Sequence, residues 1–158
     1  MDKQVSGINM KRIKIFKIVV FSLLILTGCS SNKSYEGNIT EFEYNYGSFF
    51  GGYYEYHLVL DGDVVHVTAE GMNGVELDID KEIDASILEE LSLVINTNKL
   101  ERWDGFSKED PHVLDGYSFY LSVKYDDERS LEADGYEVYP DNYEKVHEEI
   151  VELLSEIE

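Results

Sequence analysis

Alternating apolar and polar residues dominate the chain between residues 42 and 79. Every second residue is apolar in the stretches 42–46, 54–60, 65–69 and 75–79. A period of two places successive side chains on opposite faces of an extended chain, which is typical of a half-buried strand. The pattern therefore predicts four strands of one sheet, each with an apolar face and a polar face.

Turn-forming residues between these stretches predict hairpins. Residues 61–62, Asp-Gly, suit a two-residue type I′ turn, which would pair Leu58 with Val65. A three-residue loop over residues 72–74, with Gly74 in the left-handed conformation, keeps the apolar residues of the next strand on the same face. Both turns make the neighbouring strands antiparallel.

A helix is predicted next, because the spacing of the apolar residues changes to that of one helical face. Asp84 is placed to act as its N-cap, and residues 96–98, Asn-Thr-Asn, end it. The apolar stripe of this helix consists of Ile87, Leu88, Leu91, Val94 and Ile95.

Two more strands and a last helix follow. The odd-numbered residues are apolar over 117–125, and a three-residue loop at 126–128 places Leu131 on the same face. Asp141 and Glu144 form a capping-box-like pair that predicts the start of the last helix. Together the elements predict an α+β fold with an antiparallel sheet.

The expected order is ββββ-α-ββ-α, with both helices packed on one face of the sheet. These elements occupy residues 36–158, which we interpret as a single acidic domain. Cys29 is the only cysteine and precedes that domain, so no disulfide can stabilise it and the apolar core must suffice.

The residues before this domain indicate where the protein is located. Basic side chains precede an apolar run of nine residues, 18–26, which is shorter than the roughly 20 residues of a membrane span. A basic flank followed by a short apolar run predicts a secretory signal peptide. The following Thr27-Gly28-Cys29 resembles the lipobox of bacterial lipoproteins.

This resemblance implies that the signal peptide, residues 1–28, is removed and that Cys29 receives a diacylglycerol group. Two acyl chains hold a protein firmly at a membrane. Residues 29–35 would form the lipidated tether, and the domain would lie on the outer side of the cell membrane. The alternative is a stop-transfer anchor in which Cys29 is incidental.

Charge excludes one class of partner. Residues 1–28 hold five of the 13 basic and one of the 33 acidic residues, so the remaining chain has a formal charge of −24. Nucleic-acid binding depends on Lys and Arg that neutralise phosphates, so we expect no nucleic-acid partner. Such a charge favours solubility, and it would also attract cations or basic partners.

Residues 100–150 resemble a pattern in small secreted or lipoprotein domains of Gram-positive bacteria. The pattern combines a Trp-x-Gly motif, here Trp103 to Gly105, with an Asp-Gly before a strand, here Asp115 and Gly116. It ends with Gly-x-x-x-(Tyr/Phe)-Pro before a helix, here residues 135–140, with Glu137 where asparagine is frequent. The family has no assigned activity, so the resemblance implies fold and location only.

Two groups of residues are candidates for binding a metal. The predicted register places His57 directly opposite His66 on the outer face, where they could hold zinc or could simply be exposed imidazoles. Carboxylates at positions 1, 3, 5, 7 and 12 of a segment starting at Asp78 echo a calcium loop, although Ile83 replaces its glycine. This run also fits the end of a strand followed by a helix cap.

Aromatic residues supply the candidate contact sites. Phe49 and Phe50 lie between glycines in the loop 46–53, where they could form a recognition surface or fold back as core. Trp103 could stack on a sugar, or it could fill the gap between helix and sheet.

Catalysis is not expected. No Gly-x-Ser-x-Gly, Ser-x-x-Lys or phosphate-binding loop is present, and no spacing ties His112 or His147 to a nucleophile. The sequence predicts a non-catalytic lipoprotein without a cofactor that binds an envelope protein partner. The alternatives are a metal-binding or small-ligand-binding lipoprotein, and a hydrolase with an unrecognised site.

Overall fold

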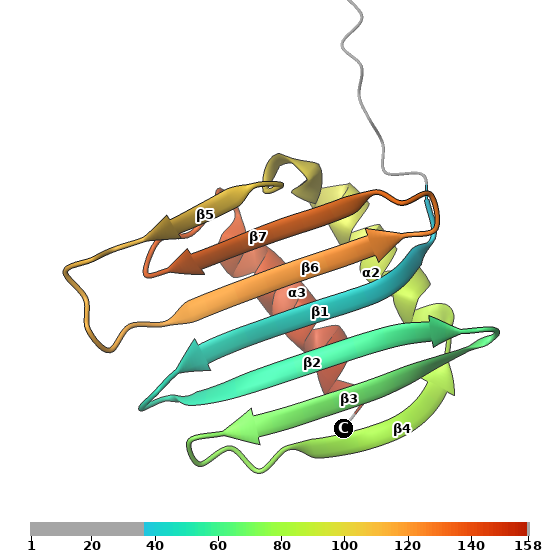
Figure 1. Cartoon of the computed structure of the whole chain (residues 1–158), viewed down its shortest axis with the longest axis horizontal. Helices are drawn as coiled ribbons and strands as arrows, with labels where there is room; N and C mark the ends of the chain where they lie inside the picture. Colours follow the sequence, from blue (N-terminus) through green and yellow to red (C-terminus); the bar gives the residue numbers. More distant parts are fainter. Residues whose placement is uncertain (1–36, 158) are drawn as a thin grey trace, which may run out of the picture. The chain divides into compact units, whose positions relative to one another are not determined.

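The structure is a computed structural model that describes residues 37–157. The predicted signal peptide, Cys29 and the tether lie outside the described residues. Strands, helices and one 3₁₀ turn follow each other along the chain (Figure 1). They are β1 (Ile39–Ser48), β2 (Gly52–Asp61), β3 (Val64–Met72), β4 (Asp78–Asp84), α2 (Ser86–Asn98), η1 (Leu100–Arg102), β5 (Phe106–Glu109), β6 (Ser118–Tyr125), β7 (Ser130–Tyr136) and α3 (Tyr143–Ser155).

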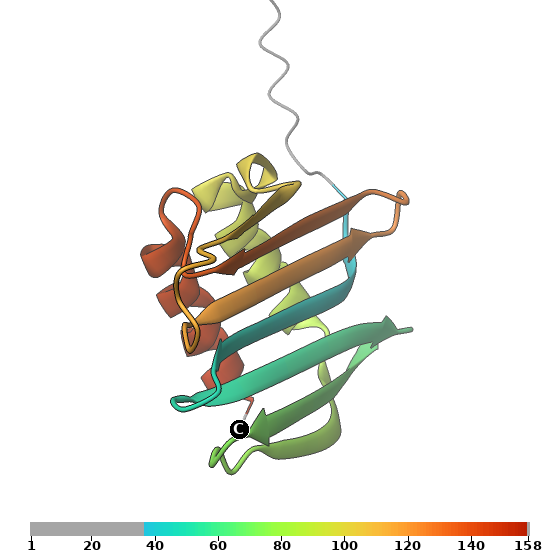
Figure 2. The same ribbon diagram turned by 60° about the vertical axis from the view of Figure 1, so that its left-hand side comes forward.

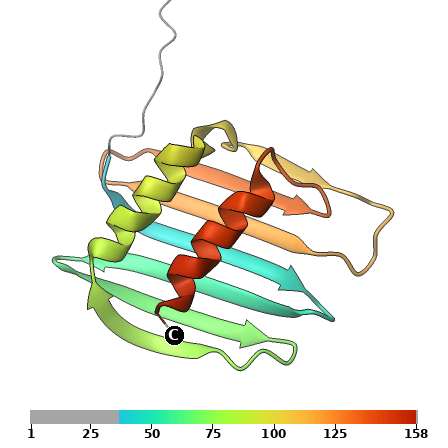
Figure 3. The same cartoon turned by 180° about the vertical axis from the view of Figure 1, so that it is seen from behind.

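The strands form one seven-stranded sheet in the order β4-β3-β2-β1-β6-β7-β5. Strand β1 lies at the centre and pairs antiparallel with both β2 and β6. Both helices cover the same face of the sheet, as predicted (Figures 2 and 3). The α+β fold class is therefore confirmed.

The core lies between this face and the helices. The alternating residues that the sequence placed inward are buried on the sheet, among them Phe42, Leu58 and Leu121. Leu91 of α2 and Ile150 of α3 pack against them. The period of two therefore predicted correctly which face of each long strand is apolar.

The hairpin between β2 and β3 has a different register from the prediction. Leu58 pairs with Val67 instead of Val65, and the two residues between the strands are Gly62 and Asp63. Gly62 occupies the first central position with a φ of 64°, as a type II′ turn requires. A shift of two residues leaves every side chain on its predicted face, so the alternation did not reveal the error.

The predicted three-residue loop at 72–74 is also wrong. Asn73 and Gly74 both have positive φ and form a two-residue turn between Met72 and Val75. The chain then continues through irregular residues, and the N–H of Gly71 donates to the carbonyl of Leu77 at 2.8 Å. These irregular residues bring the apolar side chains of β4 back to the inner face.

The hairpin between β6 and β7 has the predicted register. Val123 pairs with Leu131, and the N–H of Tyr125 donates to the carbonyl of Arg129 across a three-residue loop. Glu128, the last residue of that loop, has a φ of 65°. This left-handed residue is what a three-residue hairpin loop requires.

Neither helix begins with the predicted side-chain cap, because Ala85 and not Asp84 is the N-cap of α2, and no side chain caps that helix. Asp84 Oδ1 accepts the N–H of Ser86 at 2.9 Å at the start of α2, and this bond holds the pKa of Asp84 below its usual value. The predicted capping pair of Asp141 and Glu144 is wrong, because no side chain caps α3 and Asn142 precedes it in a left-handed conformation.

Strand β5 was not predicted. It pairs parallel with β7 at the edge of the sheet, with Phe106 opposite Ala133. It has only four residues, three of them polar, so its sequence carries little strand signal. Its partner β7 supplies the hydrogen bonds that keep it extended.

Aromatic side chains fill the space between the sheet and α3. The buried Tyr44 hydroxyl is hydrogen-bonded to Nδ1 of His147 at 2.7 Å, and burial raises the pKa of Tyr44 so that it stays protonated. The His147 ring also stacks on Tyr143 and meets Tyr46 edge-on. Burial lowers the pKa of His147, although the nearby Glu148 opposes that shift.

Folding stability should therefore decrease as the pH falls below the ordinary histidine pKa of 6.5. The unfolded chain takes up a proton on His147 before the folded chain does, so acid favours unfolding in the interval between the two pKa values. Urea unfolding at pH 7.5 and 5.5 measures this effect. The decrease should be smaller in His147→Phe, and an equal decrease in both proteins would contradict the assignment.

Candidate functional site

Phe49 and Phe50 project from the turn that joins β1 to β2. Their side chains are 68% and 75% exposed, and their rings meet edge to face at 5.2 Å between centroids. Of the two interpretations of this loop, the structure excludes the one in which the rings fold back as core. The loop is also shorter than expected, because Ser48 pairs with Gly52 and only three residues lie between them.

The backbone of this turn explains why the rings point outward. Gly47 has a φ of 133°, and a Cβ there would lie 2.2 Å from the carbonyl oxygen of Gly52. The buried Ser48 Oγ accepts the N–H of Gly51 at 2.8 Å. The chain therefore reverses so tightly that Phe49 and Phe50 have no core to enter.

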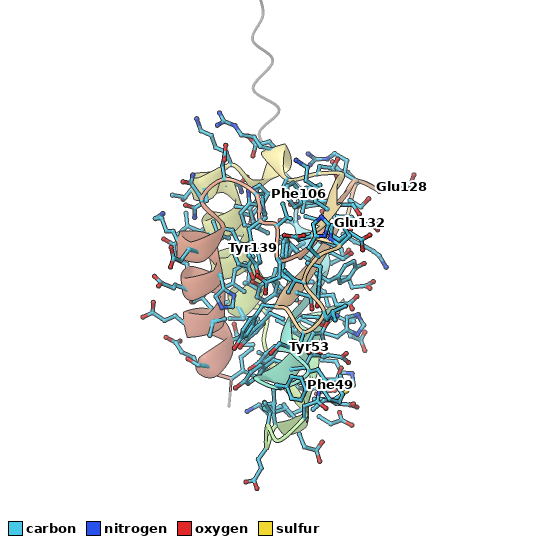
Figure 4. All side chains as sticks on the ribbon, turned by 90° about the vertical axis from the view of Figure 1, so that its left-hand side faces the viewer. Phe49, Tyr53, Phe106, Glu128, Glu132 and Tyr139 are labelled. Carbon is cyan, nitrogen blue, oxygen red and sulfur yellow. The ribbon has the colours of Figure 1, made fainter. Side chains whose placement is uncertain are left out.

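Other exposed apolar side chains lie at the same end of the sheet. Seven large hydrophobic side chains are exposed among the described residues, and all but Leu93 of α2 lie in or beside the loops where β1, β3, β5 and β7 end (Figure 1). Figure 4 looks onto this end, with Phe49 and Tyr139 labelled. We call this group the apolar end surface, and it comprises Phe49, Phe50, Met72, Leu114, Tyr117 and Tyr139.

Hydrogen bonds and close contacts tie these loops together. The N–H of Tyr117 donates to Oε1 of Glu137 at 2.5 Å, and the hydroxyl of Tyr139 donates to the carbonyl of Tyr117 at 3.2 Å. Gly51 lies so close to Tyr117 that a Cβ would be 2.6 Å from the tyrosine hydroxyl. Three of the loops that form the surface, 49–51, 110–117 and 137–142, thus support each other.

Glu137 lies in the Gly-x-x-x-(Tyr/Phe)-Pro motif of residues 135–140, in the loop between β7 and α3. Its φ is 55°, which is the left-handed region that asparagine enters more readily than most residues. Gly135, the first residue of that motif, has no room for a Cβ, which would lie 2.6 Å from the ring of Phe119. Both motif positions therefore have a structural role in shaping the loop between β7 and α3.

The charge around the apolar end surface is negative. The loops 49–51, 73–77, 110–117 and 137–142 contain no Lys or Arg. Their carboxylates are Glu76, Asp110, Asp115, Glu137 and Asp141. A partner for this surface would need apolar side chains surrounded by positive charge.

The histidine pair does not form as predicted. His57 faces Thr68 and His66 faces Val59, because the register differs by two residues. His57 Nε2 lies 3.2 Å from Glu41, whereas His66 Nε2 lies 2.6 Å from Asp80. Each imidazole thus has its own carboxylate partner on the outer face, and the two are not directly opposite each other.

The acidic run does not form a calcium loop. Its first four carboxylates, from Asp78 to Asp84, belong to the extended strand β4. Glu89 lies on α2. Among residues 37–157, no group of three or more histidine, cysteine or acidic side chains is arranged to hold a metal ion.

Trp103 belongs to the core. It is only 4% exposed, and its ring lies 6.2 Å from Phe119 and 6.0 Å from Tyr143 between centroids. Its Nε1 donates to the carbonyl of Asp141 at 3.1 Å. The interpretation in which Trp103 fills the gap between helix and sheet matches this position, whereas stacking on a sugar does not.

Sequence reasoning missed a pocket of about 300 Å³ beside Trp103. It lies where the end of α2, η1, β5 and the loop before α3 meet, and Lys99, Arg102 and Lys108 line it. These cations come from separate elements, and no motif joins them. A count of basic residues per segment would have shown that they cluster between residues 99 and 108.

Comparisons with known proteins give no further guide to function. No protein-family model matches the chain, and neither a curated protein nor a solved structure matches it. In the part of the chain that the structure describes, no helix has the length and apolar character needed to cross a membrane.

Proposed function

We propose that this protein is a lipoprotein, anchored through Cys29 on the outer side of a cell membrane, whose domain binds another envelope protein through the apolar end surface. The observation that carries the proposal is the exposure of Phe49 and Phe50 on a hydrogen-bonded turn. Exposed aromatic side chains that cluster on one surface are typical of interaction sites. The domain acts by binding and carries out no reaction.

The direction of β1 supports this proposal. The first strand, β1, begins at Ile39 and ends at the Phe49–Phe50 turn (Figure 1). Ten residues of strand separate the two ends by about 30 Å. The apolar end surface therefore lies at the end of the sheet opposite to Ile39, where β1 begins.

The chemistry of the partner follows from the surface. Phe49 and Phe50 require an apolar pocket, and the surrounding carboxylates require basic side chains at its edge. An anionic lipid surface is disfavoured, because these carboxylates would be repelled by it. The partner is therefore an envelope protein with an apolar, positively edged site.

Photo-crosslinking in intact cells tests this proposal. We expect a photoreactive amino acid at position 50 to give a discrete adduct with one envelope protein, and the same group at position 93 to give none. Leu93 is the matched control, because it is 67% exposed on α2, away from the surface. The adduct should be lost in Phe49→Ser, because the aromatic pair is broken.

The stability of the variant distinguishes recognition from folding. Phe49 is exposed, so its replacement should change the free energy of unfolding by less than about 0.5 kcal/mol. Adducts with lipid alone, or equal adducts from positions 50 and 93, would refute the proposed function.

A further inference from the structure

Positive charge is rare in this domain and unevenly placed. Residues 37–157 contain 30 acidic residues and only seven Lys or Arg. Three of those seven, Lys99, Arg102 and Lys108, line the pocket beside Trp103. In a chain with about four carboxylates for each basic residue, a local excess of positive charge is an exception that needs a physical reason.

The three cations of the pocket also differ from the others in their partners. Lys124, Arg129 and Lys145 each form an ion pair with a carboxylate. Lys81 donates to the carbonyl of Ile157. By contrast, Lys99, Arg102 and Lys108 take part in none of the ion pairs within the described residues.

Aromatic rings supply the apolar part of the same pocket. Trp103, Phe106 and Tyr139 line it, and the ammonium group of Lys108 lies 5.1 Å from the centre of the Phe106 ring. Figure 4 shows Phe106 and Tyr139 on the side where α3 and the sheet face each other. A planar ligand could stack on the more exposed rings, Phe106 or Tyr139, while its charge meets the cations.

The start of α3 adds a weaker preference for anions. Asn142, the residue before the helix, lines the pocket, and no side chain caps the first turn. A helix N-terminus carries partial positive charge. This partial charge adds to the stronger attraction of an anion by the three cations.

Counting charges identifies the ligand class. Three cations and Asp141, the acidic side chain that lines the pocket, leave a local charge of about +2. A phosphate monoester carries roughly −1.5 to −2 at neutral pH, and Arg binds phosphate oxygens with two parallel hydrogen bonds. A volume of about 300 Å³ is at the small end of ligand pockets. We infer that this pocket binds a small phosphate monoester that carries a single ring.

The only tryptophan of the chain lines this pocket, so its fluorescence reports on binding. The full chain, in non-ionic detergent, would be titrated with phenyl phosphate, inorganic phosphate and phenol. We expect saturable binding of phenyl phosphate that is about tenfold tighter than that of inorganic phosphate, because the ring adds stacking. Phenol should give no saturable change.

Substitutions then locate the site. The double variant Lys99→Gln, Arg102→Gln should weaken phenyl phosphate binding by at least about tenfold, because charge-assisted hydrogen bonds are lost. Lys124→Gln is the matched control, because Lys124 is paired with Glu41 on the outer face of the sheet. It should leave binding unchanged.

Three results would overturn the inference. They are the absence of saturable binding of phenyl phosphate, equal affinity for inorganic and phenyl phosphate, and equal loss of binding in the control variant. The pocket shares Tyr139 with the apolar end surface, but Phe49 and Phe50 do not line the pocket and Lys99 and Arg102 are not part of that surface. The Phe49 and Lys99/Arg102 variants therefore test the two activities separately.

Discussion

Replacing Trp103 with alanine is expected to lower the free energy of unfolding by about 3–5 kcal/mol. The side chain is almost completely buried and packs against Phe119 and Tyr143, which link the sheet to α3. Its removal would leave a cavity and would deprive the carbonyl of Asp141 of its hydrogen-bond donor. Urea unfolding followed by circular dichroism measures the loss.

Two variants serve as controls for this effect. Trp103→Phe keeps a ring but loses the hydrogen bond, so its loss should be smaller. Leu93→Ala removes an exposed side chain and should change the free energy of unfolding by less than about 0.5 kcal/mol. A loss below about 1 kcal/mol for Trp103→Ala would show that the ring is not a core residue.

The second large effect is expected at Gly47, where alanine should destabilise the fold by about 2–4 kcal/mol. The residue has a φ of 133°, and the added Cβ would meet the carbonyl oxygen of Gly52 and the Cα of Tyr53. Both contacts are with backbone of the paired strand, so they can be relieved only if β1 and β2 move apart. Urea unfolding is again the measurement.

Gly62→Ala separates the cost of a positive φ from the cost of the close contact at Gly47. Gly62 also has a positive φ, 64°, but nothing lies within 4 Å of the added Cβ. It should lose only the roughly 1–2 kcal/mol that a left-handed conformation costs a residue with a side chain. Equal losses at both positions would show that the close approach at Gly47 contributes nothing.

The orientation of Phe49 and Phe50 could be only partly predicted. The surrounding glycines indicated a turn, but they are compatible with rings that point outward or back into the core. The contact between Gly47 and Gly52 and the bond to Ser48 Oγ decide between these possibilities. Such contacts depend on how the two strands pair, which local sequence does not determine.

The errors in the predicted strand register also arise because local sequence does not determine how two strands pair. Alternation distinguishes even from odd positions only, so a strand can slide by two residues without moving any side chain to the wrong face. The hairpin between β6 and β7 was predicted correctly because a loop of three residues fitted both the turn and the faces. The position of His57 relative to His66 needed the exact register, and for this reason the predicted pair failed.

The sequence by itself determined which residues are buried on the long strands and helices, because burial follows the period of two or of 3.6. It also determined the fold class, since apolar faces of this kind must pack against each other. Only the tertiary structure decided that β1 lies beside β6, that the loops unite exposed apolar residues at one end, and that Lys99, Arg102 and Lys108 share a pocket. These arrangements join distant segments, and their energies depend on packing in three dimensions that no local pattern encodes.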